Sequence, residues 1–163
     1  MLETAKPALR KILPTERRMK LISSALNSMT TPPSKPKTDS KDHFIERNGI
    51  RYAGTHLILD LWGANHLDNL ELVEKALRQA TAEAGATLLH LHLHHFTPNG
   101  GISGVAVLAE SHISIHTWPE YEYAALDVFM CGDAAPHRTL EVFQKTFQPH
   151  RILVNEQMRG GTV

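Results

Sequence analysis

The sequence predicts an α+β fold, a two-layer sandwich in which two helices cover one face of a mostly antiparallel sheet. Six segments have the alternation or β-rich composition of strands, and two longer segments repeat apolar residues at helical spacing. Four of the six strands follow each other through short connections, which favours antiparallel neighbours. The resulting order, β-α-β-β-β-β-α-β, lets both helices pack on the same sheet face.

The folded domain is expected to begin near Gly49. A chain of 163 residues, 42% of them apolar, is long enough for one domain with a single core. Residues 28–44 (SMTTPPSKPKTDSKDHF) are rich in Pro, Ser, Thr and Lys, a composition typical of a linker. We therefore expect residues 1–48 to form a disordered or loosely structured extension and residues 49–163 to form the domain.

Charge and cysteine content limit the classes of function. Residues 1–50 hold ten Lys and Arg against five Asp and Glu, but the cations are scattered among Pro, Thr and Ser. That pattern favours a solvated tail over an arm that binds nucleic acid or a membrane. The apolar runs fall short of the ~18 residues of a membrane helix, and a single cysteine fits a reducing compartment. We expect a cytoplasmic protein, with a transit peptide at the basic N-terminus as the alternative.

The first predicted strand is residues 55–63 (THLILDLWG), in which three alternating leucines share one face and a glycine ends the pattern. A helix follows within residues 66–86. Asn65 or Asp68 can cap its start and Gly85 can end it. Its apolar positions recur at helical spacing: Leu70, Val73, Leu77 and Ala80.

The third predicted element, residues 87–96 (TLLHLHLHHF), is a strand of strict period two. Leucines at positions 89, 91 and 93 share one face, and histidines at positions 90, 92 and 94 share the other. We expect the histidines to lie on the sheet face that carries no helix. That face must then contact solvent or another surface, such as the sheet of a second subunit.

The remaining elements are a turn, three strands, a helix and a last strand. The second helix places Leu140, Phe143 and Phe147 on its inner face. In order, these elements are the turn 97–101 (TPNGG), strands 102–110 (ISGVAVLAE), 112–118 (HISIHTW) and 123–130 (YAALDVFM), helix 137–147 (HRTLEVFQKTF) and strand 151–158 (RILVNEQM).

Reactive side chains concentrate in residues 110–132 (ESHISIHTWPEYEYAALDVFMCG). A serine hydroxyl is a poor nucleophile without a base or a polarised carbonyl. His116, on the same predicted strand, is a candidate base, and the peptide bond beside Ser111 is its own link to Glu110. Attack there would shift the acyl group from nitrogen to oxygen, and elimination and hydrolysis would leave a pyruvoyl group at residue 111. The alternative is an ordinary turn serine, because Glu-Ser-His tripeptides are common.

Other candidate sites have competing structural interpretations. Cys131 is either a small core residue or, facing a polar site, a proton donor or nucleophile controlled by its pKa. Phe96 is either a core residue or a platform for a flat ligand. A hydrolase triad is disfavoured because the chain has no G-x-S-x-G motif. A phosphate loop is disfavoured because TPNGG lacks the Lys-Ser/Thr ending.

The alternating histidines suggest a metal site as a rival interpretation. Imidazoles are common Zn²⁺ ligands, but side chains two positions apart on a strand lie ~6–7 Å apart along it. Convergence on one ion would need a bulge, and no Cys pair or H-E-x-x-H motif supports it. A polar layer between two sheets is the favoured interpretation.

Taken together, these motifs resemble the prokaryotic S-adenosylmethionine decarboxylase proenzymes. ESHISIHTWPE is preceded by ISGVAV and followed by YAALDVFMCG, and the combined pattern is far more specific than its parts. The resemblance runs from about Gly54 to Gly132, and more loosely to Gly160, so residues 1–48 inherit nothing from it. The turn FTPNGGISG holds one residue more than the family pattern, and we expect the turn to absorb the additional glycine.

The resemblance implies self-cleavage between Glu110 and Ser111. The products would be a β chain of residues 1–110 and an α chain of residues 111–163, whose N-terminal pyruvoyl group, derived from Ser111, is the cofactor and forms a Schiff base with the substrate. It implies no metal. His116 would then remove the α-proton during processing.

The resemblance also assigns roles to four further residues. Ser103 would assist the acyl shift, and Cys131 would donate a proton after CO₂ leaves. Phe96 would stack on adenine, and Glu120 would hold the ribose hydroxyls. A cationic sulfonium substrate also suits residues 51–163, which hold seven Lys and Arg against twelve Asp and Glu.

The implied function is decarboxylation of S-adenosylmethionine for spermidine biosynthesis. Two alternatives remain open: a pyruvoyl-dependent decarboxylase of ornithine or arginine, and an unprocessed protein that binds a metal or a partner. We also expect a homodimer, a dimer of β/α heterodimers. Its helix-free sheet faces would pack together into an αββα assembly, or its sites would be shared across the interface.

Overall fold

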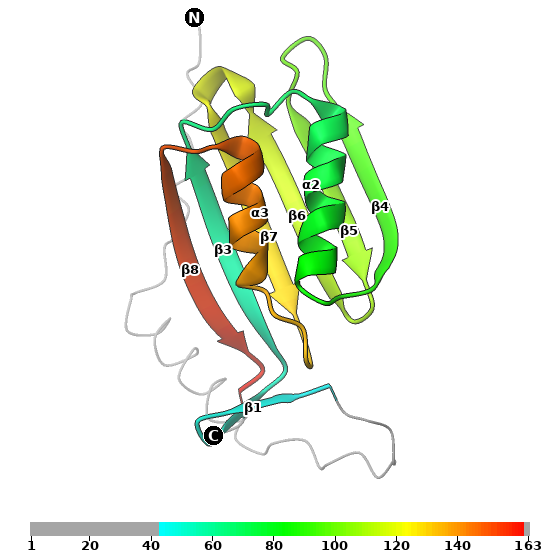
Figure 1. Ribbon diagram of the computed structural model, residues 1–163, viewed down its shortest axis with the longest axis vertical. Helices are drawn as coiled ribbons and strands as arrows, with labels where there is room; N and C mark the ends of the chain where they lie inside the picture. Colours follow the sequence, from blue (N-terminus) through cyan, green and yellow to red (C-terminus); the bar gives the residue numbers. More distant parts are fainter. Residues whose placement is uncertain (1–42, 162–163) are drawn as a thin grey trace, which may run out of the picture. The chain divides into compact units, whose positions relative to one another are not determined.

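Two helices lie against one face of a six-stranded sheet in the computed structural model, which describes residues 43–161 (Figure 1). The strand order is β4-β5-β6-β7-β3-β8, and every neighbouring pair is antiparallel. The elements are β1 (Ile45–Arg47), β2 (Ile50–Tyr52), β3 (Gly54–Trp62), α2 (Leu70–Glu83), β4 (Leu88–His95), β5 (Ile102–Leu108), β6 (Ser111–Trp118), the 3₁₀ helix η1 (Pro119–Tyr121), β7 (Tyr123–Met130), α3 (Arg138–Phe147) and β8 (Arg151–Arg159).

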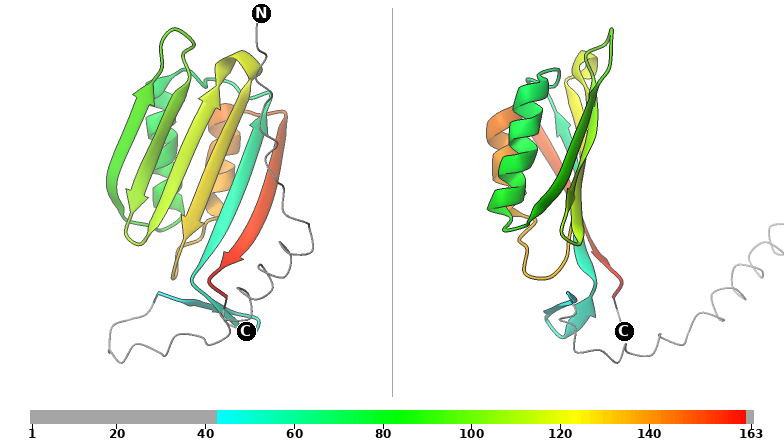
Figure 2. Two further views of the ribbon diagram at one scale, coloured as in Figure 1. Left: turned by 180° about the vertical axis from the view of Figure 1, so that it is seen from behind. Right: turned by 90° about the vertical axis from the view of Figure 1, so that its right-hand side faces the viewer.

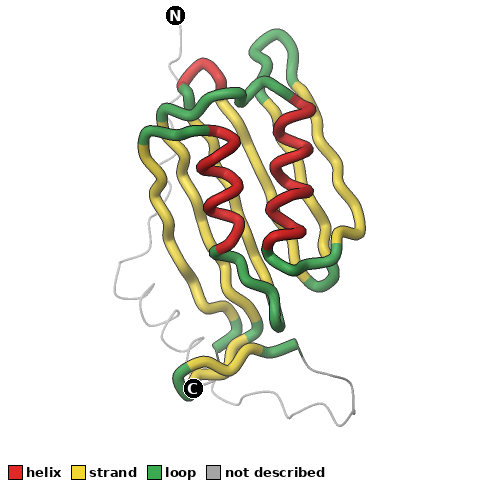
Figure 3. The backbone as a smooth tube through the Cα atoms, in the orientation of Figure 1, coloured by secondary structure: helices red, strands yellow, loops and turns green. Residues whose placement is uncertain are grey.

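The predicted α+β class is confirmed, as is the placement of both helices on one sheet face. Seen edge-on, α2 and α3 lie on the same side of the sheet, and from behind the strands are not covered by any helix (Figure 2). The short connections between β4, β5, β6 and β7 run at the two ends of the sheet (Figure 3). We call the uncovered side the open face.

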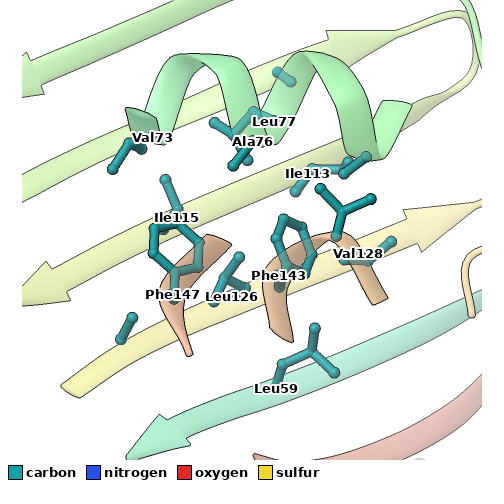
Figure 4. Packing of buried hydrophobic residues seen from close by; sticks show 14 of the residues in the cluster. Leu59, Val73, Ala76, Leu77, Ile113, Ile115, Leu126, Val128, Phe143 and Phe147 are labelled. Atoms are coloured by element: carbon teal, nitrogen blue, oxygen red, sulfur yellow. The ribbon is translucent and has the colours of Figure 1, made fainter. Parts of the chain in front are cut away.

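The core fills the space between the sheet and the two helices. The alternating leucines of β3 are fully buried, as are Val73 and Leu77 of α2 and Phe143 and Phe147 of α3. Figure 4 shows the two phenylalanines over the strands, with the α2 side chains beside them. Burial of each such side chain contributes about 1.5–3 kcal/mol, so the periodicity of the sequence accounts for this layer.

The start of α2 differs from the expectation. Asn69, rather than Asn65 or Asp68, is the N-cap, and its side chain accepts a hydrogen bond from the backbone N–H of Leu72 at 3.0 Å. Each of the three is a favoured N-cap type, so composition alone could not choose among them. Gly85 follows the C-cap with a φ of 72°, in agreement with its predicted role.

Leu89 is a second correction. It was expected to share a face with the leucines at 91 and 93, but it is exposed, while Leu88 packs against the core instead. The pairing of β4 with β5 shifts register between Leu88 and His90. Because a bulge adds one residue to one strand, it reverses which side chain faces inward. The histidines at 90, 92 and 94 remain on the open face, opposite Val107, Val105 and Ser103.

A two-stranded hairpin, β1–β2, precedes the sheet and was not predicted. Its turn is Asn48–Gly49, with φ values of 54° and 77°. Positive φ at both central residues is the geometry that Asn-Gly favours in a two-residue hairpin. The domain boundary predicted at residues 48 and 49 therefore falls inside this turn, and residues 1–42 of the expected extension lie outside the described residues.

Candidate active site

Four of the predicted site residues line one cavity of about 180 Å³: Phe96, Ser103, His116 and Glu120. We call it the Phe96 cavity; its other lining residues are Asn99, Gly101, Thr117 and Trp118. Ser103 and His116 are register partners in the β5–β6 pair, and Ser103 Oγ lies 2.8 Å from His116 Nδ1. A hydroxyl and an imidazole at hydrogen-bond distance can exchange a proton.

The turn between β4 and β5 positions Phe96. The backbone N–H of Phe96 donates to Gly101 O at 2.8 Å, and that of Gly100 donates to Phe96 O at 2.9 Å. A Cβ atom on Gly101 would lie 2.8 Å from Thr117 O, so only glycine fits where the turn meets β6. The expectation that the turn absorbs an additional glycine relative to the family pattern stays a prediction.

Thr117 supports the same cavity, although no sequence motif singled it out. It is buried, its Oγ accepts a hydrogen bond from the N–H of Ile102 at 2.8 Å, and it donates one to Leu67 O at 2.7 Å. One side chain thus joins β5, β6 and the segment before α2. One feature of the sequence could have found it: Thr117 follows the buried isoleucines of β6 at period two, so a polar side chain was expected on the buried face.

The predicted scissile bond lies in the tight turn between β5 and β6. Leu108 pairs with Ser111, so Ala109 and Glu110 form a two-residue loop; we call residues 108–111 the cleavage hairpin. Glu110 has a φ of 60°, a left-handed conformation that costs a residue with a side chain about 1–2 kcal/mol. The backbone of the bond is therefore strained at the residue whose carbonyl would be attacked.

Cys131 lies beside the cleavage hairpin. Its backbone N–H donates a hydrogen bond to Ser111 Oγ at 3.2 Å, so the hydroxyl oxygen has a defined position. Burial, and secondly the negative charge of Glu110, raise the pKa of the Cys131 thiol. The thiol is thus held in its protonated form, which is the form a proton donor requires.

The predicted residues fall into two groups within one chain. Glu110, Ser111 and Cys131 gather where β5 turns into β6, whereas Ser103 and His116 of the Phe96 cavity lie toward the opposite ends of these two strands. Figure 2 shows the two ends of the sheet. Ser111 and His116 are five residues apart on β6, about 16 Å along the strand. An odd spacing also places them on opposite faces. The structure does not bring His116 to the Ser111 of its own chain.

The open face holds a polar network that sequence reasoning missed. His56 Nε2 lies 3.1 Å from Asp127 Oδ1, Ser114 Oγ donates to Asp127 Oδ2 at 3.1 Å, and an Arg159 nitrogen lies 3.3 Å from His56 Nδ1. Burial, and then the neighbouring His56, lower the pKa of His112, although Asp127 acts to raise it. Alternation along β3 would have placed His56 on this face, but nothing in the sequence paired it with Asp127.

Aromatic rings stack on the open face near the Phe96 cavity. Tyr123 lies between Trp62 and Trp118, with ring centroids 4.4 Å and 5.3 Å away. Its hydroxyl donates to Asp60 Oδ1 at 2.5 Å. Burial and this hydrogen bond raise the pKa of Tyr123 to about 12. These rings give the face large apolar surfaces around a few fixed polar groups.

Two further findings concern only residues 43–161. Within that range, no group of three or more His, Cys, Asp or Glu side chains is arranged to hold a metal ion, and this includes the alternating histidines of β4. Neither of the described α-helices has the length and apolar character needed to cross a membrane.

Comparison with known proteins gives a consistent result. Residues 55–160 match the family model described as S-adenosylmethionine decarboxylase. The S-adenosylmethionine decarboxylase proenzyme of Thermomicrobium roseum is 46% identical over 112 residues, covering 68% of this chain and 97% of that protein. The proenzyme of Methanococcus maripaludis strain C7 is 49% identical over 114 residues, covering 68% and 93%.

A solved structure agrees with the sequence relatives. The crystal structure of the adenosylmethionine decarboxylase from Aquifex aeolicus superposes with a TM-score of 0.62 at 36% identity, covering 67% of this chain and 92% of that one. The family model spans well over half of the chain and includes the cleavage hairpin, the Phe96 cavity and Cys131. The chain belongs to the S-adenosylmethionine decarboxylase family.

Proposed function

We propose that this chain is a self-cleaving decarboxylase of S-adenosylmethionine, cut between Glu110 and Ser111, whose product enters spermidine biosynthesis. The observation that carries the proposal is the cleavage hairpin. It combines a strained Glu110, with a φ of 60°, and a Ser111 hydroxyl oxygen held 3.2 Å from the Cys131 nitrogen. Strain in the ground state is relieved when the bond breaks, so the turn favours cleavage.

The cleavage chemistry uses only groups of the chain and water. Ser111 Oγ attacks the carbonyl carbon of Glu110; the new C–O bond forms, the C–N bond breaks, and the hydroxyl proton moves to the nitrogen. A base then removes the α-proton of residue 111, and the Cβ–O bond breaks with Glu110 leaving as a carboxylate. The product at residue 111 is dehydroalanine, an enamine, which becomes an imine when a proton moves from its nitrogen to Cβ. Water then adds to the imine and ammonia departs, which leaves the pyruvoyl group.

The surroundings of residue 111 fit such a group. Residue 111 begins a strand beside a partly buried thiol and becomes a chain end after cleavage. Once formed, the pyruvoyl carbonyl supplies an electron sink for the charge left when CO₂ departs. In this proposal the Cys131 thiol delivers the proton that quenches that charge.

The substrate is proposed to bind in the Phe96 cavity. The half-exposed Phe96 ring offers a face for adenine, and the Glu120 carboxylate can accept hydrogen bonds from the ribose hydroxyls. Sites for molecules of drug size are typically roughly 300–1,000 Å³, so a cavity of about 180 Å³ encloses only part of the substrate. A second surface would complete the site.

We propose that this second surface belongs to another copy of the chain. Five large apolar side chains are exposed on the open face: Ile58, Trp62, Val107, Trp118 and Leu153. An uncovered sheet face that carries exposed apolar side chains is suited to contact another protein surface. A closed two-fold dimer would cover them and form the αββα assembly.

Two-fold symmetry also explains the separation of the site residues. If the axis lies between the two sheets and across the strands, the partner's strands run the opposite way. The cleavage hairpin of one protomer then lies toward the Phe96 cavity of the other. Ser103 and His116 would thus assist the cleavage of the partner chain rather than their own.

Decarboxylation of ornithine or arginine remains a second candidate. The cleavage hairpin serves either reaction, but a wide aromatic face beside a carboxylate suits an adenosyl group better than a short amino acid. An unprocessed binding protein is the third candidate, for which the polar network of the open face would be the binding surface. We place the protein in the cytoplasm, which fits its lone unpaired thiol.

One set of variants separates these candidates. Ser111→Ala should leave an intact, inactive chain, whereas Ser114→Ala, a matched serine on the same strand, should cleave normally. The processed wild-type protein is then assayed for CO₂ release from S-adenosylmethionine, ornithine and arginine. Normal cleavage of Ser111→Ala would place the bond elsewhere, and release from ornithine or arginine alone would select the second candidate.

A further inference from the structure

A residue outside the family match contacts the cleavage hairpin. The match begins at residue 55, yet His43 Nδ1 lies 3.2 Å from Glu110 Oε2. Both side chains are about half exposed, at 48% and 56%. Glu110 contributes the carbonyl of the proposed scissile bond, so a segment outside the family match contacts the side chain of the residue at which cleavage would occur.

The backbone fixes His43 in this position independently of its side chain. The N–H of Gly132 donates a hydrogen bond to His43 O at 2.9 Å. Gly132 has a φ of 59°, and a Cβ atom there would lie 3.4 Å from His43 Nδ1, so the imidazole lies beside this glycine. Residue 132 follows Cys131. His43 therefore contacts the cleavage hairpin through Glu110 and, through Gly132, the residue that follows the proposed proton donor.

A contact with the Glu110 side chain can help to orient the carbonyl of this residue. In its left-handed conformation this residue has fewer backbone options at low energy than glycine would have. A side chain held at the far end restricts rotation about the Glu110 backbone and so restricts the direction of its carbonyl.

We propose that His43 is a positioning residue for self-cleavage: it holds Glu110 so that its carbonyl faces Ser111 Oγ. The role deepens the proposed cleavage and rests on it. Because His43 acts through Glu110, its contribution depends on the glutamate being present. Removing an exposed pair of this kind should lower the rate of self-cleavage by up to about fivefold.

The experiment follows cleavage of the full chain made by cell-free synthesis, measured as the intact fraction against time by mass spectrometry. We expect His43→Ala to slow cleavage about threefold to fivefold, and His43→Gln, which keeps a donor toward Glu110, to restore most of the rate. The double variant His43→Ala with Glu110→Ala, in which residue 110 has no side-chain acceptor, should cleave no more slowly than Glu110→Ala alone. A role in packing only would instead slow both backgrounds equally.

The chain offers a matched control in His137, whose Nε2 lies 3.1 Å from Glu156 Oε2 at comparable exposure, 48% and 40%. His137→Ala should cleave at the wild-type rate. Three results would each overturn the role of His43: a wild-type cleavage rate in His43→Ala, equal slowing by His43→Ala in the Glu110→Ala background, or equal slowing by His137→Ala. A wild-type chain that never cleaves would overturn the proposed cleavage itself, and the role of His43 with it.

Discussion

Ser111 and His116 lie on the same strand, five residues apart and on opposite faces of the sheet. His116 is instead paired with Ser103, at 2.8 Å, in a cavity toward the far end of β6. A base cannot act over about 16 Å of strand. Within the proposed dimer, the base for each Ser111 must come from the other protomer.

Mixed dimers test this exchange. His116→Ala chains produced alone should remain uncleaved, because neither protomer supplies the base. Co-produced with Ser111→Ala, the His116→Ala chains should cleave, because the Ser111→Ala partner supplies an intact His116. Intact mass spectrometry distinguishes the two chains by mass. Cleavage of His116→Ala in the absence of a partner would show that His116 is dispensable, and no cleavage in the mixture would favour action within one chain.

Phe96→Ala should weaken substrate binding without affecting maturation. Stacking of a base on an aromatic ring is worth about 1–3 kcal/mol, so KM for S-adenosylmethionine should rise at least about fivefold while the chain still cleaves. Tyr121→Ala, which removes an exposed ring outside the cavity, is the control. An unchanged KM in Phe96→Ala would remove the ring from the adenine site.

Cys131 should show its role in the pH dependence of the processed enzyme. Burial, and then the negative charge of Glu110, raise the pKa of the Cys131 thiol, so the protonated, proton-donating form persists to higher pH than in a free cysteine. Activity should therefore hold through the range in which an ordinary thiol ionises and fall only above it. The rate of alkylation by iodoacetamide, which requires the thiolate, should rise in that higher pH range, where activity falls. A pKa below that of free cysteine would contradict the assignment.

Replacing Cys131 gives a complementary result. Cys131→Ala should still cleave, because the thiol takes no part in the acyl shift, but decarboxylation should fall by about 10²–10⁴-fold, the usual contribution of a general acid. Steady-state assays and intact mass on the same preparation check both statements. Full activity in Cys131→Ala would refute the role of proton donor.

Gly101→Ala should destabilise the fold around the Phe96 cavity. The added methyl would lie 2.8 Å from Thr117 O, so β5 and β6 must separate. Overpacking of this kind costs about 1–3 kcal/mol of unfolding free energy. Urea denaturation measures it, with Gly161→Ala as the control because nothing lies within 4 Å of a Cβ there. Equal stability of the two variants would contradict the close packing of this turn.

Sheet and helix layers were predictable because each follows from local periodicity. The leucines of β3 and the phenylalanines of α3 lie in the core, where alternation and helical spacing place them. The bulge at Leu88 was not predictable, because an inserted residue changes the faces without changing the composition. The β1–β2 hairpin was predictable in principle, since Asn48–Gly49 is a strong turn signal.

The candidate site was predictable as chemistry but not as geometry. Spacing along a strand already implied that Ser111 and His116 face opposite sides, but separation in space depends on which strands pair. The contact between Ser103 and His116 follows from the β5–β6 register. His43 and Glu110, 67 positions apart, meet only through the folded chain, so no local pattern could have joined them.

The most direct test of this account is the intact mass of the purified wild-type protein. We expect two chains, one ending at Glu110 and one beginning at residue 111. The second chain should be lighter by one ammonia than simple hydrolysis would give, because its first residue carries a pyruvoyl group. Borohydride reduction should add hydrogen to that chain alone. A single intact chain of 163 residues would contradict the account.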